Sequence, residues 1–174
     1  MTEASREYVL DPEASRVWIR GSSSLHPIRA SATGLTGHVR MRLDEATILE
    51  GSTLEGEVRI DVEALRSGNP LVDRETRRRI NAAEHRQIVG VATASRRLSA
   101  SVFAVEGEIA FRGTTRAVSG EIRLEVDPSG ASAVVLEGSR VLDVRDWGLD
   151  LPRLGLLKVH PDVEVRIRLV ARPR

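Results

Sequence analysis

The residues best suited to chemistry in this chain are four histidines and a serine-rich segment, "GSSSLHP" at 21–27. The histidines are His26, His38, His85 and His160. None has a second histidine at the HxH, HxxxH or HExxH spacings typical of metal sites, and no metal site is predicted. The serine segment lacks the G-x-S-x-G pattern of a nucleophile elbow. Catalysis by a hydrolase or isomerase would therefore require His26 to meet a distant acid, for which Asp73 is the candidate.

Other catalytic patterns are missing as well. Acidic residues fall almost wholly on charged faces of the segments described below, so no convergent pair of carboxylates is predicted. The chain has neither a phosphate-binding Walker loop nor a dinucleotide-binding glycine fingerprint. We therefore do not expect an enzyme, and we predict no cofactor.

A cluster of arginines lies in "SGNPLVDRETRRRI" (67–80), at Arg74, Arg77, Arg78 and Arg79. A nucleic-acid grip is not favoured, because no aromatic residues interleave with the arginines for base stacking. The preferred interpretation is the solvated face of a short helix. The alternative is a phosphate or another anionic head group resting there, since a guanidinium pairs bidentately with anionic oxygens.

The composition narrows the class of protein. The 174 residues contain 26 basic and 25 acidic side chains, which leaves a net charge of +1 and argues against a dedicated nucleic-acid binder. Cysteine is absent, and Lys158 is the only lysine. No segment approaches the roughly 20 apolar residues of a membrane span. We expect one domain over residues 1–174, cytoplasmic and without stable membrane insertion.

Alternation of apolar and charged residues recurs along the chain with the period of a β-strand. The clearest segments are 37–43, 54–62, 120–126 and 162–171, and further candidates are 15–20, 28–34, 87–95, 101–112 and 132–142. Turn signals such as "GLTG" and "FRGTT" separate most of them. The pattern predicts an all-β fold with antiparallel strands.

Long strands joined by short turns favour an up-and-down antiparallel barrel of about eight strands over a sandwich, because closure removes the sheet edges. A short helix is predicted near residues 70–81: Pro70 can open it, and Val72, Thr76 and Ile80 would form an inward stripe. An eight-stranded barrel can be filled by side chains or hold one small ligand. The scarcity of aromatic residues suits an open lumen, yet aliphatic residues can also pack solidly.

Five motifs, in order along the chain, resemble those of the YceI-like family of polyisoprenoid-binding proteins. They are "YVLDPEASRVWI" followed by His26 and Gly34, the 67–80 segment with Asp73 and Ile80, "FRGTTRAV", "RDWGLD", and "LKVHPDVEVRIRLVA". The resemblance spans about Tyr8 to Ala171. Some positions depart from the family pattern: His85-Arg86 replaces an aromatic–Pro pair, Leu35 replaces an aromatic residue, and Thr76 replaces an apolar one.

The resemblance implies an extended lipocalin-like barrel whose lumen holds an isoprenoid or a similar amphiphile. The apolar tail would then contact inward aliphatic residues, namely Val58, Ile60, Ile122, Val165 and Ile167. The polar head would lie at the mouth, near His26, Asn69, Asp73 and Trp147. For His26 the alternative is a buried histidine that bonds a backbone carbonyl.

The leading hypothesis is therefore non-enzymatic binding, sequestration or transport of an isoprenoid or other amphiphilic lipid, driven by burial of its chain. The competing hypothesis is a structural or stress-response interaction module with a packed core and no ligand. The third is the hydrolase or isomerase that uses His26 and Asp73. A homodimer is left open, because the sequence marks no exposed edge strand.

Overall fold

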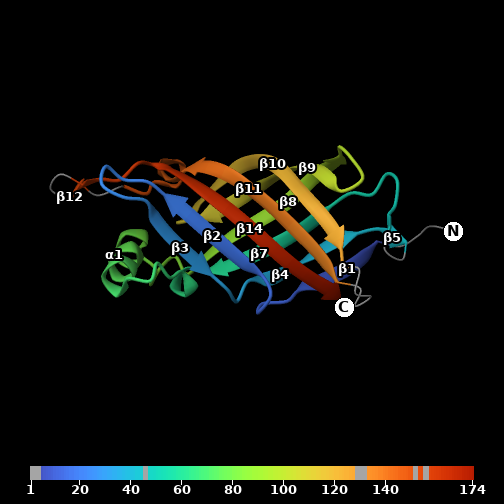
Figure 1. The fold of residues 1–174 in the computed structure, drawn as a ribbon, viewed down its shortest axis with the longest axis horizontal. Helices are drawn as coiled ribbons and strands as arrows, with labels where there is room; N and C mark the ends of the chain where they lie inside the picture. Colours follow the sequence, from blue (N-terminus) through green and yellow to red (C-terminus); the bar gives the residue numbers. More distant parts are fainter. Residues whose placement is uncertain (1–4, 45–46, 128–132, 151–152, 155–156) are drawn as a thin grey trace.

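A computed structural model of the chain describes residues 5–44, 47–127, 133–150, 153–154 and 157–174. One large antiparallel sheet dominates it, and one α-helix lies at an end of that sheet (Figure 1). The strands of the large sheet are β1 (Arg6–Leu10), β2 (Arg16–Gly21), β3 (Ile28–Ala32), β4 (Thr36–Met41), β7 (Glu55–Asp61), β8 (Gln87–Arg97), β9 (Val102–Phe111), β10 (Thr114–Val126), β11 (Val134–Asp143) and β14 (Asp162–Pro173).

Four two-residue strands form two small hairpins beside the large sheet: β5 (Leu43–Asp44) with β6 (Thr47–Ile48), and β12 (Arg153–Leu154) with β13 (Leu157–Lys158). The helices are α1 (Pro70–Ile80) and the 3-10 turns η1 (Val62–Ala64) and η2 (Val144–Trp147).

The sheet closes into an eight-stranded barrel. Neighbouring strands run β1-β4-β7-β8-β9-β10-β11-β14, and β1 pairs with β14 through Leu10 opposite Ala171. The predicted antiparallel barrel of about eight strands is confirmed. This pairing removes the sheet edges that β1 and β14 would otherwise expose.

The first two strands both pair with β14, and a turn separates them. β1 pairs with the end of β14, the chain then turns at 11–15, and β2 pairs with the earlier half of β14 through Ile19 opposite Val165. Ser15 fixes this turn: its buried hydroxyl accepts from the Val170 N–H at 3.0 Å and donates to the Val170 carbonyl at 3.3 Å. β3 adds outside β2 and reaches the η1–α1 segment by a single bridge between Ser31 and Arg66.

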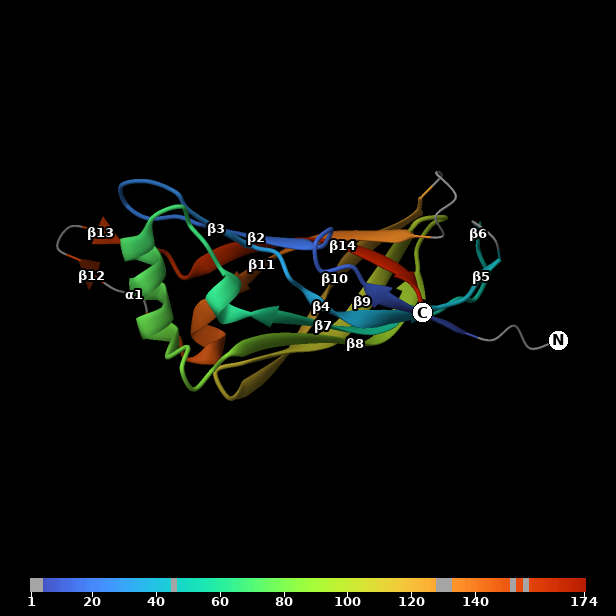
Figure 2. The same ribbon diagram turned by 90° about the horizontal axis from the view of Figure 1, so that it is seen from below.

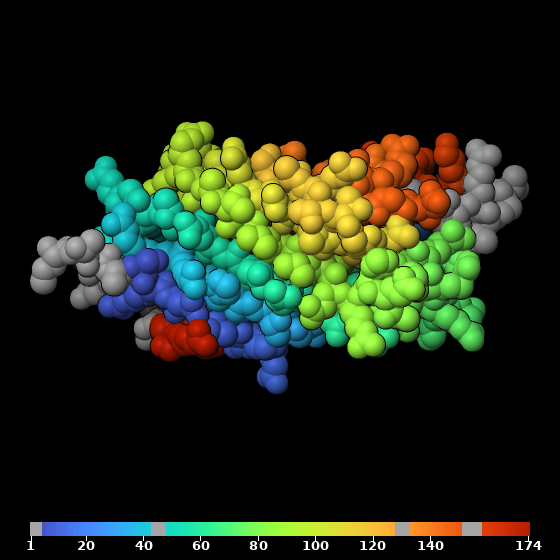
Figure 3. All heavy atoms as spheres, turned by 180° about the vertical axis from the view of Figure 1, so that it is seen from behind, coloured from blue at the N-terminus to red at the C-terminus, as the bar shows by residue number. Residues whose placement is uncertain are grey.

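The core is concentrated at the end of the barrel opposite α1. Side chains there are almost fully buried, including Phe103, Leu124, Val134, Leu136 and Ala171. Figure 2 shows this end, where β1 and the C-terminus lie, and shows α1 at the other end. Figure 3 shows β7, β8 and β9 packed side by side along one outer face, with α1 at its end.

The helix begins and ends where the sequence predicts. Asn69 caps it, since its side-chain oxygen accepts from the N–H of Leu71 at 3.0 Å and of Val72 at 3.4 Å, and Asn81 ends it with a left-handed φ of 57°. The buried face differs from the expected stripe. Ile80 is buried as expected, but Val72 and Thr76 are exposed, and Asp73 is the other buried residue.

Candidate functional site

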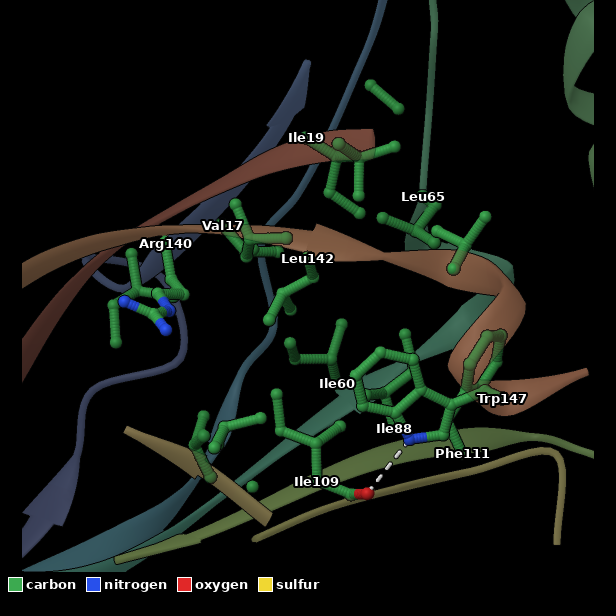
Figure 4. Close-up of a pocket in the computed structure, with 18 of the residues that line it drawn as sticks. Val17, Ile19, Ile60, Leu65, Ile88, Ile109, Phe111, Arg140, Leu142 and Trp147 are labelled. Carbon is green, nitrogen blue, oxygen red and sulfur yellow. Dashed lines mark hydrogen bonds between the residues drawn. The ribbon is translucent and has the colours of Figure 1, made fainter. Parts of the chain in front are cut away.

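A cavity of about 890 Å³ occupies the half of the barrel near α1. Its wall is largely aliphatic and comes mainly from β2, η1, β7 to β11, η2 and β14, part of which Figure 4 shows; β3, β4 and α1 also contribute residues. Cavities of roughly 300–1,000 Å³ are the size that encloses a small organic ligand. The two halves of the barrel thus differ: one is packed, and the other is hollow.

Glycines occupy inward positions on four consecutive strands of this half, β8 to β11, and one of them faces open space. In the strand register Gly90 lies opposite Val58, Gly107 opposite Val118, Gly120 opposite Val105 and Gly138 opposite Ile122. At Gly107 a Cβ atom would clash with the Val91 carbonyl oxygen, and at Gly138 it would meet the Ile122 side chain at 2.6 Å, so these two glycines allow a close approach of neighbouring atoms. At Gly120 a Cβ atom would meet nothing within 4 Å, so the space in front of it is open.

The wall is also loosened between β10 and β11. Their backbone pairing begins at Val126 opposite Val134 and ends at Ile122 opposite Gly138, although both strands continue toward α1. Beyond that point β10 pairs only with β9, and β11 only with β14. The Arg116 Nε instead donates to the Asp146 carbonyl of η2 at 2.8 Å.

All five aliphatic residues predicted to contact a ligand line this cavity: Val58, Ile60, Ile122, Val165 and Ile167. Ile60 is buried and the other four are half-buried. They share the cavity because strand alternation places them on the inward face, and the cross-strand register brings Val165 and Ile167 beside β2 and β11.

The predicted polar residues Asn69 and Asp73 also border the cavity, but their side chains hold the start of α1. Asn69 is the helix cap described above. The Asp73 carboxylate accepts from the Ser67 N–H at 2.8 Å, and the Ser67 hydroxyl lowers the pKa of that carboxyl below its usual value. These contacts fix the backbone that frames the mouth.

His26 and Trp147 border the cavity from other elements. His26 lies in the β2–β3 loop, is exposed, and has its Nδ1 3.1 Å from the Pro27 carbonyl oxygen, so it is not the buried histidine of the alternative interpretation. Trp147 is buried in η2, and its Nε1 donates to the Ile109 carbonyl at 3.0 Å (Figure 4). No hydrogen bond joins His26 to Asp73 within the described ranges, so the pair expected for a hydrolase or isomerase is not formed.

The arginine cluster divides between solvent and the cavity. Arg74 and Arg78 are exposed as expected, and Arg78 pairs with Glu75 at 2.7 Å. Arg77 and Arg79 are half-buried and border the cavity. Arg79 also pairs with Glu75, whereas the buried Nε of Arg77 has no acceptor among the residues that the structure describes.

Two features of the cavity were not predicted: the inward glycines and the inward Arg140. Both lie on faces that strand alternation defines. In "VVLEGSRVL" the inward positions of β11 are Val134, Leu136, Gly138, Arg140 and Leu142. A glycine and a charged residue on an otherwise apolar face were the signal that could have identified them.

Among the residues that the structure describes, no group of three or more histidine, aspartate or glutamate side chains is placed to hold a metal ion. No helix in the same part of the chain is long and apolar enough to cross a membrane.

Comparison with known proteins places this fold in a family. A search of curated proteins finds no match. Two solved structures align with this chain over nearly their whole length. Burkholderia cenocepacia BcnA has a TM-score of 0.76 and 14% sequence identity, and the alignment covers 92% of this chain and 98% of that one. A polyisoprenoid binding domain from Saccharophagus degradans has a TM-score of 0.74 and 13% sequence identity, and the alignment covers 96% of this chain and 98% of that one. The Campylobacter jejuni YCEI protein has a TM-score of 0.65 and 10% identity over 84% and 85%. A family model for the YceI-like domain matches residues 8–171, and the chain therefore belongs to the YceI-like domain family.

Proposed function

We propose that this protein binds an isoprenoid or a similar amphiphilic lipid in its barrel, without chemical conversion, in order to sequester or transport it. The observation that carries the proposal is the aliphatic cavity of about 890 Å³ inside a closed barrel. Its family and the polyisoprenoid binding domain among its structural neighbours support the same class of ligand.

The driving force is burial of the lipid chain. Each methylene removed from water contributes about 0.8 kcal/mol, so a chain of several isoprene units can offset the cost of ordering it. The chain would contact Val58, Ile60, Ile122, Val165 and Ile167, which line the cavity. The mouth would be framed by His26, Asn69, Asp73 and Trp147.

The competing module with a packed core is less well supported. It would require the inward side chains to fill the barrel along its whole length, and they do so only at the end that holds Phe103 and Leu124. An enzymatic role for His26 and Asp73 is also disfavoured, because each side chain is engaged with its own local backbone.

The first test is the substitution of Gly120 by phenylalanine. A Cβ at Gly120 points into open space, so the ring can enter the cavity without displacing the wall. We expect G120F to fold, to lose most of the lipid that co-purifies with the natural chain, and to bind geranylgeraniol at least about tenfold more weakly. The measurements are mass spectrometry of solvent extracts from natively purified protein, and lipid titration.

The matched control is Ser119→Phe, one residue earlier on β10. Alternation turns the Ser119 side chain to the outside, so S119F adds the same ring without filling the lumen. Equal lipid binding by G120F and S119F would move the site elsewhere. If the solvent extracts of the natural protein contain no lipid, and added prenyl lipids neither bind to it nor raise its melting temperature, the proposed function is wrong.

A further inference from the structure

The inward face of β11 carries a cation at Arg140. In the strand register Arg140 lies opposite Val165, which in turn lies opposite Ile19, so all three share the face that lines the cavity. Figure 4 shows the side chains of Arg140 and Leu142 leaving β11 on the same side, toward the cavity. Arg140 is therefore a charged residue on a strand face whose other side chains in the cavity wall, Leu136 and Leu142, are aliphatic.

Two other arginines on inward positions provide a comparison. Arg97, opposite Phe103, donates to the carbonyls of Ile48, Ser99 and Ala100 at the packed end. Arg116, opposite Ile109, donates to the Asp146 carbonyl. Arg140 differs from both, because within the described ranges it has no acceptor and no ion pair.

The surroundings of Arg140 leave room for a partner. The nearby inward position on β10 is Gly120, which has open space in front of it, and β10 no longer pairs with β11 at this level. Arg140 is accordingly exposed, and it is one of the residues that line the cavity. Water can solvate the guanidinium as long as the cavity holds no lipid.

A lipid that enters this cavity changes the hydration of the Arg140 guanidinium. Its chain displaces water, and a guanidinium that loses water without gaining a partner is costly. A neutral lipid would therefore be penalised at Arg140. A lipid that brings its own anion would instead form charge-assisted, bidentate hydrogen bonds with the guanidinium.

We propose that Arg140 binds the anionic head group of the lipid, a carboxylate or a phosphate monoester, within the lumen and not at the mouth beside α1. This proposal rests on the proposed function, since it names the class of lipid that the same cavity takes. Ile19, Leu142 and Val165 line the cavity on the same face as Arg140, so the apolar part of the lipid next to the head group would contact them.

The test uses three ligands that share one chain: geranylgeraniol, geranylgeranoic acid and geranylgeranyl monophosphate. At pH 8 the alcohol is neutral and the other two are anions. We expect the natural protein to bind at least one anion about tenfold or more tightly than the alcohol, because hydrogen bonds to charged groups contribute that much. Comparison of the acid with the phosphate shows whether the preferred head group is a carboxylate or a phosphate monoester.

Arg140→Met keeps an unbranched, flexible side chain and removes the guanidinium with its charge. We expect R140M to bind the alcohol at least as tightly as the natural protein does, and to lose the preference for the anion. Arg123→Met is the matched control: it removes one charge from the outer face of β10, where Arg123 is exposed, and should keep the preference.

Three results would overturn the proposal. Equal affinity of the natural protein for the alcohol and both anions leaves lipid binding intact but contradicts the role of Arg140. A preference that persists in R140M assigns the anion to another group. Failure of all three ligands to bind the natural protein contradicts the proposed function itself, and this proposal with it.

Discussion

Asp73 is the charged residue that the structure buries at the start of α1, with an exposed fraction of 8%. The Ser67 hydroxyl is the largest cause of its lowered pKa, and burial acts in the opposite direction. The Ser67 N–H and the positive charges of Arg77 and Arg66 lower the pKa further. The ionised carboxylate therefore ties the 67–69 loop to the helix.

Substitution of Asp73 by asparagine tests this role. We expect D73N to lower the free energy of unfolding at pH 7 by about 1–3 kcal/mol, the cost of a lost hydrogen bond to a charged group. Because the pKa is lowered on folding, the contribution of the carboxylate is present above the unfolded pKa of about 3.9 and is lost as the pH falls through the lowered folded value.

The measurement is urea denaturation of both proteins at pH 7 and at about pH 3, below the unfolded pKa of about 3.9. The difference between the natural protein and D73N should shrink at the lower pH. Glu121→Gln, on the exposed face of β10, should show no comparable difference. A D73N cost that is the same at both pH values would rule out the charge as its origin.

At the residue scale, the sequence predicted apolar positions better than polar contacts. Val58, Ile122 and Val165 were identifiable because alternation alone decides which face a strand residue occupies. The partners of Asn69, Asp73 and Trp147 depend on which backbone atoms the fold brings near them, which no local pattern specifies. Arg140 interrupts an apolar face, and that anomaly is visible in the sequence.

At the scale of elements, one hairpin turn joins three parts of the mouth. Arg112 and Gly113 occupy the two central positions between β9 and β10, with φ of 50° and 74°, as a type I′ turn requires. The Arg112 guanidinium donates to the Ile80 carbonyl at 3.3 Å, to the Trp147 carbonyl at 3.2 Å and to the Gly148 carbonyl. The turn thus connects the end of α1 to η2.

Arg112→Asn separates this connection from the turn itself. Asparagine tolerates a positive φ, so the hairpin should form while the three hydrogen bonds are lost. We expect R112N to lower the free energy of unfolding by about 1–3 kcal/mol and to speed amide hydrogen exchange at the end of α1. Urea denaturation and exchange mass spectrometry measure the two effects.

Arg112→Gly is the control for backbone strain, because glycine adopts this φ freely. If R112N and R112G lose stability equally, the guanidinium is responsible. Unchanged exchange at 77–80 in both variants would show that α1 is held by other contacts.

The elements themselves were largely predictable, and their connections were not. The helix at 70–81 and the long strands follow from local capping and alternation. A turn separates β1, which pairs with the end of β14, from β2, which pairs with its earlier half. This turn depends on the contact of Ser15 with Val170, which lies 155 positions away in the sequence. The exposed Val72 and Thr76 differ from the expected stripe because α1 lies over a hollow and not over a packed core.

At the scale of the whole molecule, the barrel combines the two interiors that the sequence left as alternatives. Inward leucine and phenylalanine side chains fill the end opposite α1, whereas the wall of the other half is rich in valine and isoleucine and includes inward glycines. The packed half supplies stability that does not depend on a ligand. The hollow half can then keep its apolar wall available without collapse of the barrel.

Leu124 and Ile122 lie two positions apart on β10 and test this division. Leu124 is 1% exposed in the packed half, so L124A should lower the free energy of unfolding by about 2–5 kcal/mol and leave lipid affinity unchanged under conditions where it is folded. Ile122 lines the cavity, so I122A should cost about 1 kcal/mol or less, because it enlarges a space that already exists, but should weaken geranylgeraniol binding severalfold through lost contacts. Urea denaturation gives the free energy of unfolding of each variant, and lipid titration gives its affinity for geranylgeraniol. If I122A loses as much stability as L124A, or L124A weakens binding as much as I122A, stability and binding do not reside in separate halves of the barrel.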